Sequence, residues 1–157
     1  MDLLFVVALA ATGAYMLNTQ QQRRRIVLLA QHLQPYQIER LMETLTQGYL
    51  RAMGEQDPER RQQVLNLLAS SEAQLSEQFE RFAADFRRVP APLARASRLA
   101  LGLPFATQLL PAATFDMREA IDVHARGIAR VARNDAGLSP RDKAFTMTAE
   151  LLLLQHT

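Results

Sequence analysis

The sequence predicts an all-α protein in which a single N-terminal transmembrane helix precedes a soluble bundle of about four to five helices. The first observation is that residues 3–17 carry no charged side chain. The second is that apolar residues in the rest of the chain recur at three- and four-residue steps, the period of an amphipathic helix. The third is that no segment shows the strict alternation of a half-buried strand. We therefore divide the 157 residues into a transmembrane anchor with its basic stop, residues 1–25, and a helical domain, residues 26–157.

The opening segment, Leu3–Leu17, is apolar enough for a membrane but short. As a helix it spans about 22 Å at 1.5 Å per residue, whereas the hydrocarbon core of a bilayer is about 30 Å thick. The uncharged residues 18–22 extend the charge-free run to about 20 residues, the length that a transmembrane helix needs. Arg23, Arg24 and Arg25 would then lie at the level of the lipid head groups. We predict that these three arginines mark the membrane interface.

The charges around this segment predict its orientation. Asp2 precedes the apolar run, whereas the nearest basic residues follow it. The positive-inside rule then places the protein in a bacterial inner membrane, with its N-terminus in the periplasm and its helical domain in the cytoplasm. One alternative is a cleaved signal peptide, for which Ala8-Leu9-Ala10 would supply the cleavage site but which lacks a basic start. The other is the first helix of a soluble core.

The anchor helix is expected to continue to about Leu33, because Pro35 prevents its extension. The next helix is predicted from Tyr36 to Met53, with Gly54 as its C-terminal cap. Its apolar positions follow three- and four-residue steps. They are Ile38, Leu41, Met42, Leu45, Tyr49 and Met53.

The longest helix is predicted over Pro58–Val89. Asp57 is a favoured N-cap residue, Pro58 suits the first helical position, and Glu59 lies in the first turn, where an acidic side chain is favourable. The apolar stripe of this helix is predicted to face the core. It consists of Leu68, Leu75, Phe79, Phe82 and Phe86.

Prolines interrupt the chain after this helix. Pro90 and Pro92 end it, because proline lacks the amide hydrogen that a helix interior requires. We expect a short helix near Leu93–Leu101 and then an irregular apolar connection. Two further prolines lie in that connection.

Two more helices complete the predicted bundle. One begins at Asp116 or Met117 and ends within Asn134–Gly137, and the last begins with Ser139 as its cap and Pro140 at its first position. The first of these helices is expected to bury one face. The residues assigned to that face are Ile121, Val123, His124, Ile128 and Val131.

Composition excludes several classes of site. The sequence has no cysteine, which rules out disulfides, thiolate catalysis and cysteine-ligated metal centres. All 18 basic residues are arginine except Lys143, and 16 residues are acidic. The resulting net charge of +2 is too small to predict nucleic-acid binding. The predominance of arginine, with abundant alanine and leucine, indicates a GC-rich genome.

The sequence contains no catalytic, cofactor-binding or metal-binding motif. His32, His124 and His156 each lack a second histidine three or four residues away, so no helical zinc-binding pair is predicted. The glycines form no phosphate-binding motif, and no serine lies in a nucleophile elbow. We therefore predict no cofactor and favour a protein that is not an enzyme. The alternative is an enzyme whose site the fold assembles near His124.

The segment Phe86–Phe115 contains four arginines and no acidic residue. One interpretation is a second membrane contact, in which each basic residue near anionic lipid contributes about 1 kcal/mol. The other, which we favour, is a connection packed over the core. Its arginines would then pair with acidic residues of the long helix, namely Glu72, Glu77, Glu80 or Asp85. The candidate contacts for lipid or a partner are Arg87, Arg88, Arg95, Arg98 and Phe105.

Small residues in the opening segment predict helix pairing in the membrane. Ala10, Gly13 and Ala14 would let another transmembrane helix approach closely, although the GxxxG motif is absent. The leading hypothesis is a single-pass inner-membrane protein that serves as an accessory, assembly or scaffolding subunit of a membrane-associated complex. Its expected partners are the lipid bilayer and a membrane protein. The main alternative is a module that binds anionic lipid through residues 86–115.

Overall fold

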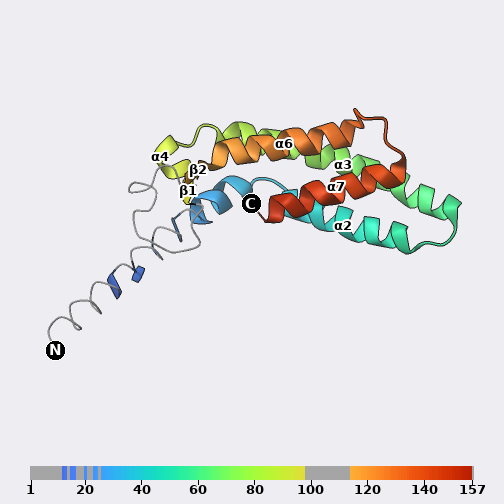
Figure 1. Ribbon diagram of the computed structural model, residues 1–157, viewed down its shortest axis with the longest axis horizontal. Coiled ribbons are helices and arrows are strands. Elements are labelled where there is room, and N and C mark those ends of the chain that lie inside the picture. The colour runs from blue at the N-terminus through green and yellow to red at the C-terminus, as the bar shows by residue number, and fades with distance from the viewer. Residues whose placement is uncertain are drawn as a thin grey trace.

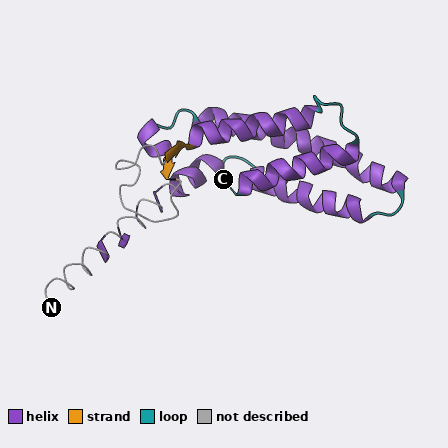
Figure 2. Cartoon of the chain, viewed as in Figure 1, coloured by secondary structure: helices purple, strands orange, loops and turns teal. Residues whose placement is uncertain are grey.

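A computed structural model describes residues 12, 13, 15, 16, 20, 23, 24, 26–97 and 114–156. The described chain is mostly helical, as predicted (Figure 2). Residues 26–33 are helical and lead through a turn into the first long helix. The elements that follow are α2 (Ile38–Gly54), α3 (Pro58–Phe86), α4 (Ala91–Ala94), β1 (Arg95–Ser97), β2 (Thr114–Asp116), α6 (Met117–Arg133) and α7 (Pro140–Gln155).

The four long helices form a bundle in which α3 is central. It packs against α2 on one side and α6 on the other, while α7 contacts α6 and, more lightly, α3 and α2 (Figure 1). Because the connections between α2 and α3 and between α6 and α7 are short, each of these pairs is antiparallel (Figure 1). The predicted bundle of helices is thereby confirmed.

The helix starts confirm the caps predicted from the sequence. Asp57 accepts a hydrogen bond from the Glu59 amide at 3.0 Å, and the Ser139 hydroxyl accepts one from the Asp142 amide at 3.2 Å. Asp116 caps α6 in the same way. Each cap satisfies an amide that has no partner within the helix.

Asn134 ends α6 in the left-handed conformation, with φ of 57°. Asparagine tolerates this conformation better than most residues because its short polar side chain bonds locally. Here the side-chain amide donates to the Leu138 carbonyl at 3.0 Å, and the side-chain oxygen accepts from the Leu138 amide at 2.8 Å. The turn between α6 and α7 is fixed by these two bonds.

The short helix predicted at Leu93–Leu101 is only partly correct, because Leu93 and Ala94 belong to α4 but the next three residues are not helical. Helix α4 ends at Ala94, and Arg95–Ser97 is a strand that pairs antiparallel with Thr114–Asp116. In the register of this small sheet, Arg95 faces Asp116 and Ala96 faces Phe115. Three residues are too few for a recognisable alternation, so the sequence pattern did not reveal the strands.

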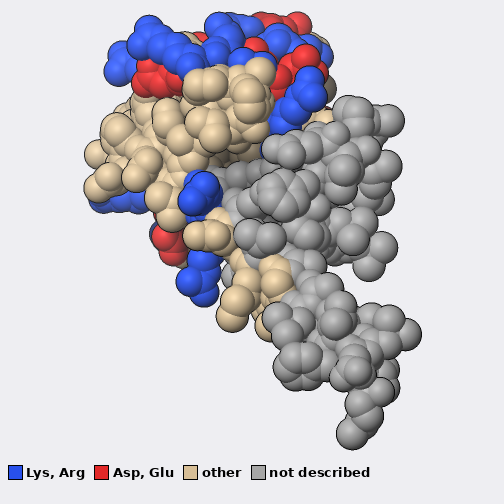
Figure 3. Space-filling model, turned by 90° about the vertical axis from the view of Figure 1, so that its left-hand side faces the viewer, with Lys and Arg blue, Asp and Glu red and all other residues tan. Residues whose placement is uncertain are grey.

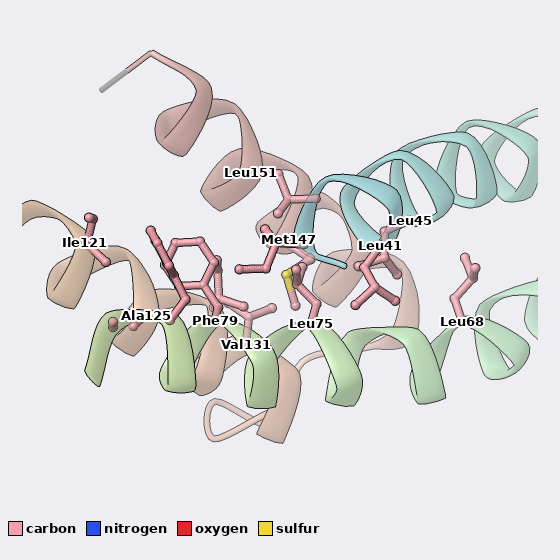
Figure 4. Packing of buried hydrophobic residues seen from close by; sticks show 14 of the residues in the cluster. Leu41, Leu45, Leu68, Leu75, Phe79, Ile121, Ala125, Val131, Met147 and Leu151 are labelled. Atoms are coloured by element: carbon pink, nitrogen blue, oxygen red, sulfur yellow. The ribbon is translucent and has the colours of Figure 1, made fainter. Parts of the chain in front are cut away.

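The core lies between the four long helices. The predicted stripe of α3 is confirmed, because all five of its residues are buried. Figure 4 shows side chains of α2, α3, α6 and α7 pointing toward one another, among them Leu45, Phe79, Ala125 and Met147. The assignment of Val123 to the buried face of α6 is wrong, since this side chain is exposed. It lies two residues from Ile121, and residues at that spacing point to different sides of a helix.

The two ends of the bundle differ in structure. Residues 26–33, α4, β1 and β2 lie at one end, which we call the sheet end, and the connections 55–57 and 134–139 lie at the other, which we call the loop end (Figure 1). Figure 3 views the molecule from the sheet end. Basic and acidic side chains gather along one rim of this end, next to a broad area without charged side chains (Figure 3).

The predicted anchor falls largely outside the described residues, since only seven positions in the range 1–25 are described. Among the helices that the structure does describe, none combines the length and the apolar character needed to cross a bilayer. The structure therefore gives no support to the transmembrane helix. The boundary at residue 25 stays a prediction.

Candidate functional site

Two of the three predicted interface arginines are described. Arg23 and Arg24 lie beside Val27, Leu28 and Leu93 around an open hollow of about 490 Å³. The structure thus brings the basic stop next to α4, at the sheet end. Arg25 lies outside the described residues.

The residues predicted to pair helices in the membrane are mostly not described. Ala10 and Ala14 lie outside the described residues. Gly13 is exposed, and apart from its neighbours in the chain and the backbone of its own helix, no atom of the described residues lies within 4 Å of the position that a Cβ would occupy there. Helix pairing through these three residues stays a prediction.

The arginines at the end of α3 are paired with carboxylates. Arg87 Nε donates to both carboxylate oxygens of Asp122 on α6, at 3.0 and 2.9 Å, and this contact raises the pKa of Arg87. Arg88 lies 3.7 Å from Asp85, one of the four predicted partner acids. Asp85 also accepts a hydrogen bond from the Tyr36 hydroxyl, which raises the pKa of Tyr36. These pairs reduce the positive charge that this region offers to anionic lipid.

The strands continue this pattern of charge compensation. Arg95 stands opposite Asp116, which also caps α6 and accepts from the Arg118 guanidinium at 2.6 to 3.1 Å. The bond from Arg118 lowers the pKa of Asp116. Arg98 and Phe105 lie outside the described residues, so the contact predicted for them stays a prediction.

His124 lies in the wall of an apolar pocket of about 370 Å³. The pocket lies at the sheet end, where residues 26–33, both strands and the four long helices all contribute to its wall. Its apolar side chains include Leu33, Met42, Phe79 and Phe115, whereas Glu39, His124 and Gln155 bear the polar groups. An enzyme site near His124, the alternative from the sequence, would need several polar groups around this residue. The described wall is mainly apolar and does not favour that alternative.

No metal centre accompanies this pocket in the part of the chain that the structure describes, because no three histidine or acidic side chains there are grouped closely enough to hold an ion.

A buried polar cluster joins α2, α3 and α7, and the sequence analysis missed it. Glu72 is 4% exposed. Its Oε1 accepts from the Tyr49 hydroxyl at 2.5 Å, and its Oε2 lies 2.5 Å from the Lys143 ammonium. Burial and the bond to Glu72 raise the pKa of Tyr49 far above its usual value, so the phenol stays neutral.

Two features of the sequence point to this cluster. Glu72 interrupts a seven-residue apolar repeat, because it follows Leu68 by four residues and precedes Leu75 by three. A polar residue at such a position often fixes the register of packed helices. Lys143 is the only lysine in the sequence. Its ammonium is a compact charge on a flexible four-carbon stem, which reaches Glu72 from α7.

The groove between α2 and α7 is open to the surface. It contains a small hollow of about 120 Å³ whose wall includes Leu50, Met53 and Phe145. Leu50 is 70% exposed and Phe145 is 53% exposed. The Arg141 guanidinium lies 5.6 Å from the centroid of the Phe145 ring, within the range of a cation–π interaction. We call this groove the α2–α7 seam.

Helix α7 is apolar on more than the face that it buries. Ala144, Met147 and Leu151 are buried in the core, whereas Phe145 and Leu152 are exposed. These two residues are seven apart and therefore lie on one face of the helix, and Phe145 lines the seam. A helix of a soluble bundle normally presents polar residues there.

Comparison with known proteins gives no relative from which a function could be taken: no protein-family model, no curated protein and no solved structure matches the chain.

Proposed function

We propose that this protein is a single-pass inner-membrane protein whose helical bundle acts as an accessory or scaffolding subunit for a membrane-protein partner. The anchor is supported by the charge-free run of residues 3–22 and by the arginines that follow it. These features favour a periplasmic N-terminus and a cytoplasmic bundle. The observation that carries the interaction role is the open α2–α7 seam.

The seam has the properties of a helix-binding groove. Its apolar side chains, Leu50, Met53 and Phe145, stand at the rim of a hollow between two helices of the bundle. An amphipathic helix of a partner would bury these side chains and fill the hollow, as in other helix-in-groove complexes. Contiguous exposed apolar surface on a folded protein commonly marks such a contact.

The sheet end supports an orientation for the bundle. Exposed apolar side chains there include Ile26, Val27 and Leu93, close to Arg23 and Arg24. The connections at the loop end, residues 55–57 and 134–137, consist mainly of polar and charged residues. A bundle with its sheet end toward the membrane would place the apolar and basic residues at the lipid surface.

The interaction role is tested with charge substitutions in the seam. Phe145→Glu and Leu50→Glu should abolish a complex that the full chain forms in membranes, detected by cross-linking before solubilisation and by native mass afterwards. Leu67→Glu is the matched control, because Leu67 is 76% exposed on α3 outside the seam. Substitutions at exposed sites change stability by about 0.5 kcal/mol or less. A chain that is monomeric in every variant, including the parent, would contradict the proposed role.

The anchor is tested separately. The full chain should remain in the membrane fraction after alkaline carbonate extraction, and a chain without residues 1–25 should be released. A reporter fused after Thr157 should read out the cytoplasm on a chain whose N-terminus is intact. A periplasmic reading on a shortened chain would instead identify the opening segment as a cleaved signal peptide.

A further inference from the structure

We propose that the apolar pocket at the sheet end binds a single-chain amphiphile with an uncharged polar head. This inference goes beyond the proposed function and does not depend on the partner. It begins from the size of the pocket, about 370 Å³, which falls in the range of small-molecule sites, about 300–1,000 Å³. The pocket lies where residues 26–33, both strands and the four long helices meet, and ligand sites in helical bundles commonly lie between the helices.

The wall suits an alkyl chain. Apolar side chains come from every element around the pocket, among them Leu33, Met42, Phe79, Phe115 and Leu154. Methionine side chains are flexible and polarisable, and Met42 and Met117 both line the pocket. The two methionines can adjust to alkyl chains of different length or to a double bond, whereas the phenylalanine rings of the wall are rigid.

The polar groups of the wall determine the head group. Glu39 and Gln155 are exposed and His124 is half-buried, so Glu39 and Gln155 stand where the pocket meets solvent. The exposed side-chain amide of Gln155 can hydrogen-bond a hydroxyl group. The Glu39 carboxylate at the mouth of the pocket repels an anionic head, because like charges at short range repel each other. The pocket should therefore prefer a fatty alcohol or a monoacylglycerol to the corresponding fatty acid.

The pocket is also distinct from the α2–α7 seam as a place for apolar contact. The seam is a shallow groove with a hollow of about 120 Å³. The pocket is about three times larger in volume and is walled by residues 26–33, the strands and the ends of the helices. The larger volume of the pocket leaves room for more of a ligand than the hollow in the seam does.

The test uses the full chain in phosphatidylcholine nanodiscs with a trace of hexadecanol that carries a diazirine on its chain. After irradiation, mass spectrometry of peptides should locate the adducts on segments that contain Met42, Phe115 and Met117. A hexadecanoic acid with the same diazirine should give at most one third of that yield at pH 7.5. Glu39→Gln should raise the yield of the acid probe to that of the alcohol.

Two variants close the pocket from different sides. Ala120→Phe fills it from α6, and Gln155→Trp covers its mouth from an exposed position that does not disturb the core. Each should lower the yield of the alcohol adduct at least fivefold, while Gln63→Trp, at an exposed position of α3, should leave it unchanged. The unfolding midpoint of each variant is measured alongside, and Gln155→Trp decides the result if Ala120→Phe does not fold.

Three results would overturn the proposal. The first is an absence of adducts on the residues that line the pocket, which would show that the pocket does not bind the alcohol. The second is labelling that concentrates on Leu50 and Phe145 of the seam or persists in both closing variants. The third is equal labelling by the acid and alcohol probes in the parent chain, which would show that Glu39 does not disfavour an anionic head group.

Discussion

Replacing Lys143 with methionine keeps most of the length and apolar stem of the side chain and removes the ammonium that faces Glu72. The Glu72 carboxylate then lies in the core with the Tyr49 hydroxyl as its one remaining hydrogen-bond donor among the described contacts. Breaking a buried ion pair by removing one partner costs about 3–5 kcal/mol. The Lys143 side chain is 17% exposed, so water can reach the vacated position and the cost should fall near the lower limit. We expect a loss of about 3 kcal/mol, a large part of the stability of a typical domain.

The double variant Glu72→Leu/Lys143→Met should be much more stable than the single one. Replacing both charges by apolar groups of similar size is often neutral or stabilising. The remaining penalty comes from the Tyr49 hydroxyl, and an unpaired buried hydroxyl costs about 1–3 kcal/mol. The double variant should therefore lie within about 2 kcal/mol of the parent, and adding Tyr49→Phe should recover most of that difference.

The assay is equilibrium urea unfolding of the full chain at pH 7, followed by circular dichroism. The two single variants and the double variant form a cycle whose coupling energy should exceed about 1.5 kcal/mol. The reasoning is refuted if Lys143→Met loses less than about 1 kcal/mol, or if the double variant is less stable than Lys143→Met alone.

The same cluster predicts an alkaline transition. The folded chain holds the pKa of Tyr49 above its usual value, so the stability from the neutral phenol is complete below the unfolded pKa of about 10. It is lost as the pH rises above that value, because the unfolded chain gains stability by ionising. Tyr49→Phe should therefore flatten the fall in stability between about pH 10 and pH 12, measured by urea midpoints. An unchanged slope would contradict the burial of this phenol.

Further predictions concern two glycines and one capping residue. Gly48→Ala should destabilise the protein, because the new Cβ would lie 2.5 Å from Leu68 Cδ2 in the core. Overpacking of this kind costs about 1–3 kcal/mol of stability. That cost exceeds the stabilisation of up to about 1 kcal/mol that alanine brings to a helix relative to glycine. Gly127→Ala should be neutral or stabilising, since its Cβ meets the end of the flexible Glu150 side chain, which can move aside. A lower melting temperature for Gly127→Ala than for Gly48→Ala would contradict both predictions. Asp116→Asn should cost about 1 kcal/mol at pH 7 and much less at pH 3. The lowered pKa of Asp116 gives stability that is present above the unfolded pKa of about 3.9 and is lost as the pH falls through the folded value. Equal costs of Asp116→Asn at both pH values would be inconsistent with that shift.

Local signals in the sequence predicted the helices well. Asp57 and Ser139, each followed by proline, located two helix starts, and the apolar stripe of α3 identified its buried face. These predictions depend on residues within one or two turns of each other. The predicted end of α3 at Val89, directly before Pro90, lies three residues beyond the observed end at Phe86.

The features that were missed depend on residues far apart in the sequence. The strand Arg95–Ser97 is defined by its pairing with Thr114–Asp116, and neither segment has a pattern of its own. The partner of Arg87 is Asp122, 35 residues away on α6. The pocket around His124 likewise arises where residues 26–33, the strands and the helix ends meet. The position of His124 in the sequence does not indicate which residues surround it in the fold.

The proposed orientation of the bundle is tested most directly by measuring which of its ends faces the membrane. Because the chain has no cysteine, a single cysteine can be introduced at Leu93 in the sheet end or at Gln56 in the loop end and labelled with a fluorophore. The 29 residues of α3 separate the two ends by about 40 Å at 1.5 Å per residue, which exceeds the range of a lipid-borne nitroxide quencher. In membranes that contain this quencher, we expect strong quenching at position 93 and almost none at position 56. Equal quenching at both positions, or stronger quenching at position 56, would contradict the proposed orientation of the bundle on the membrane.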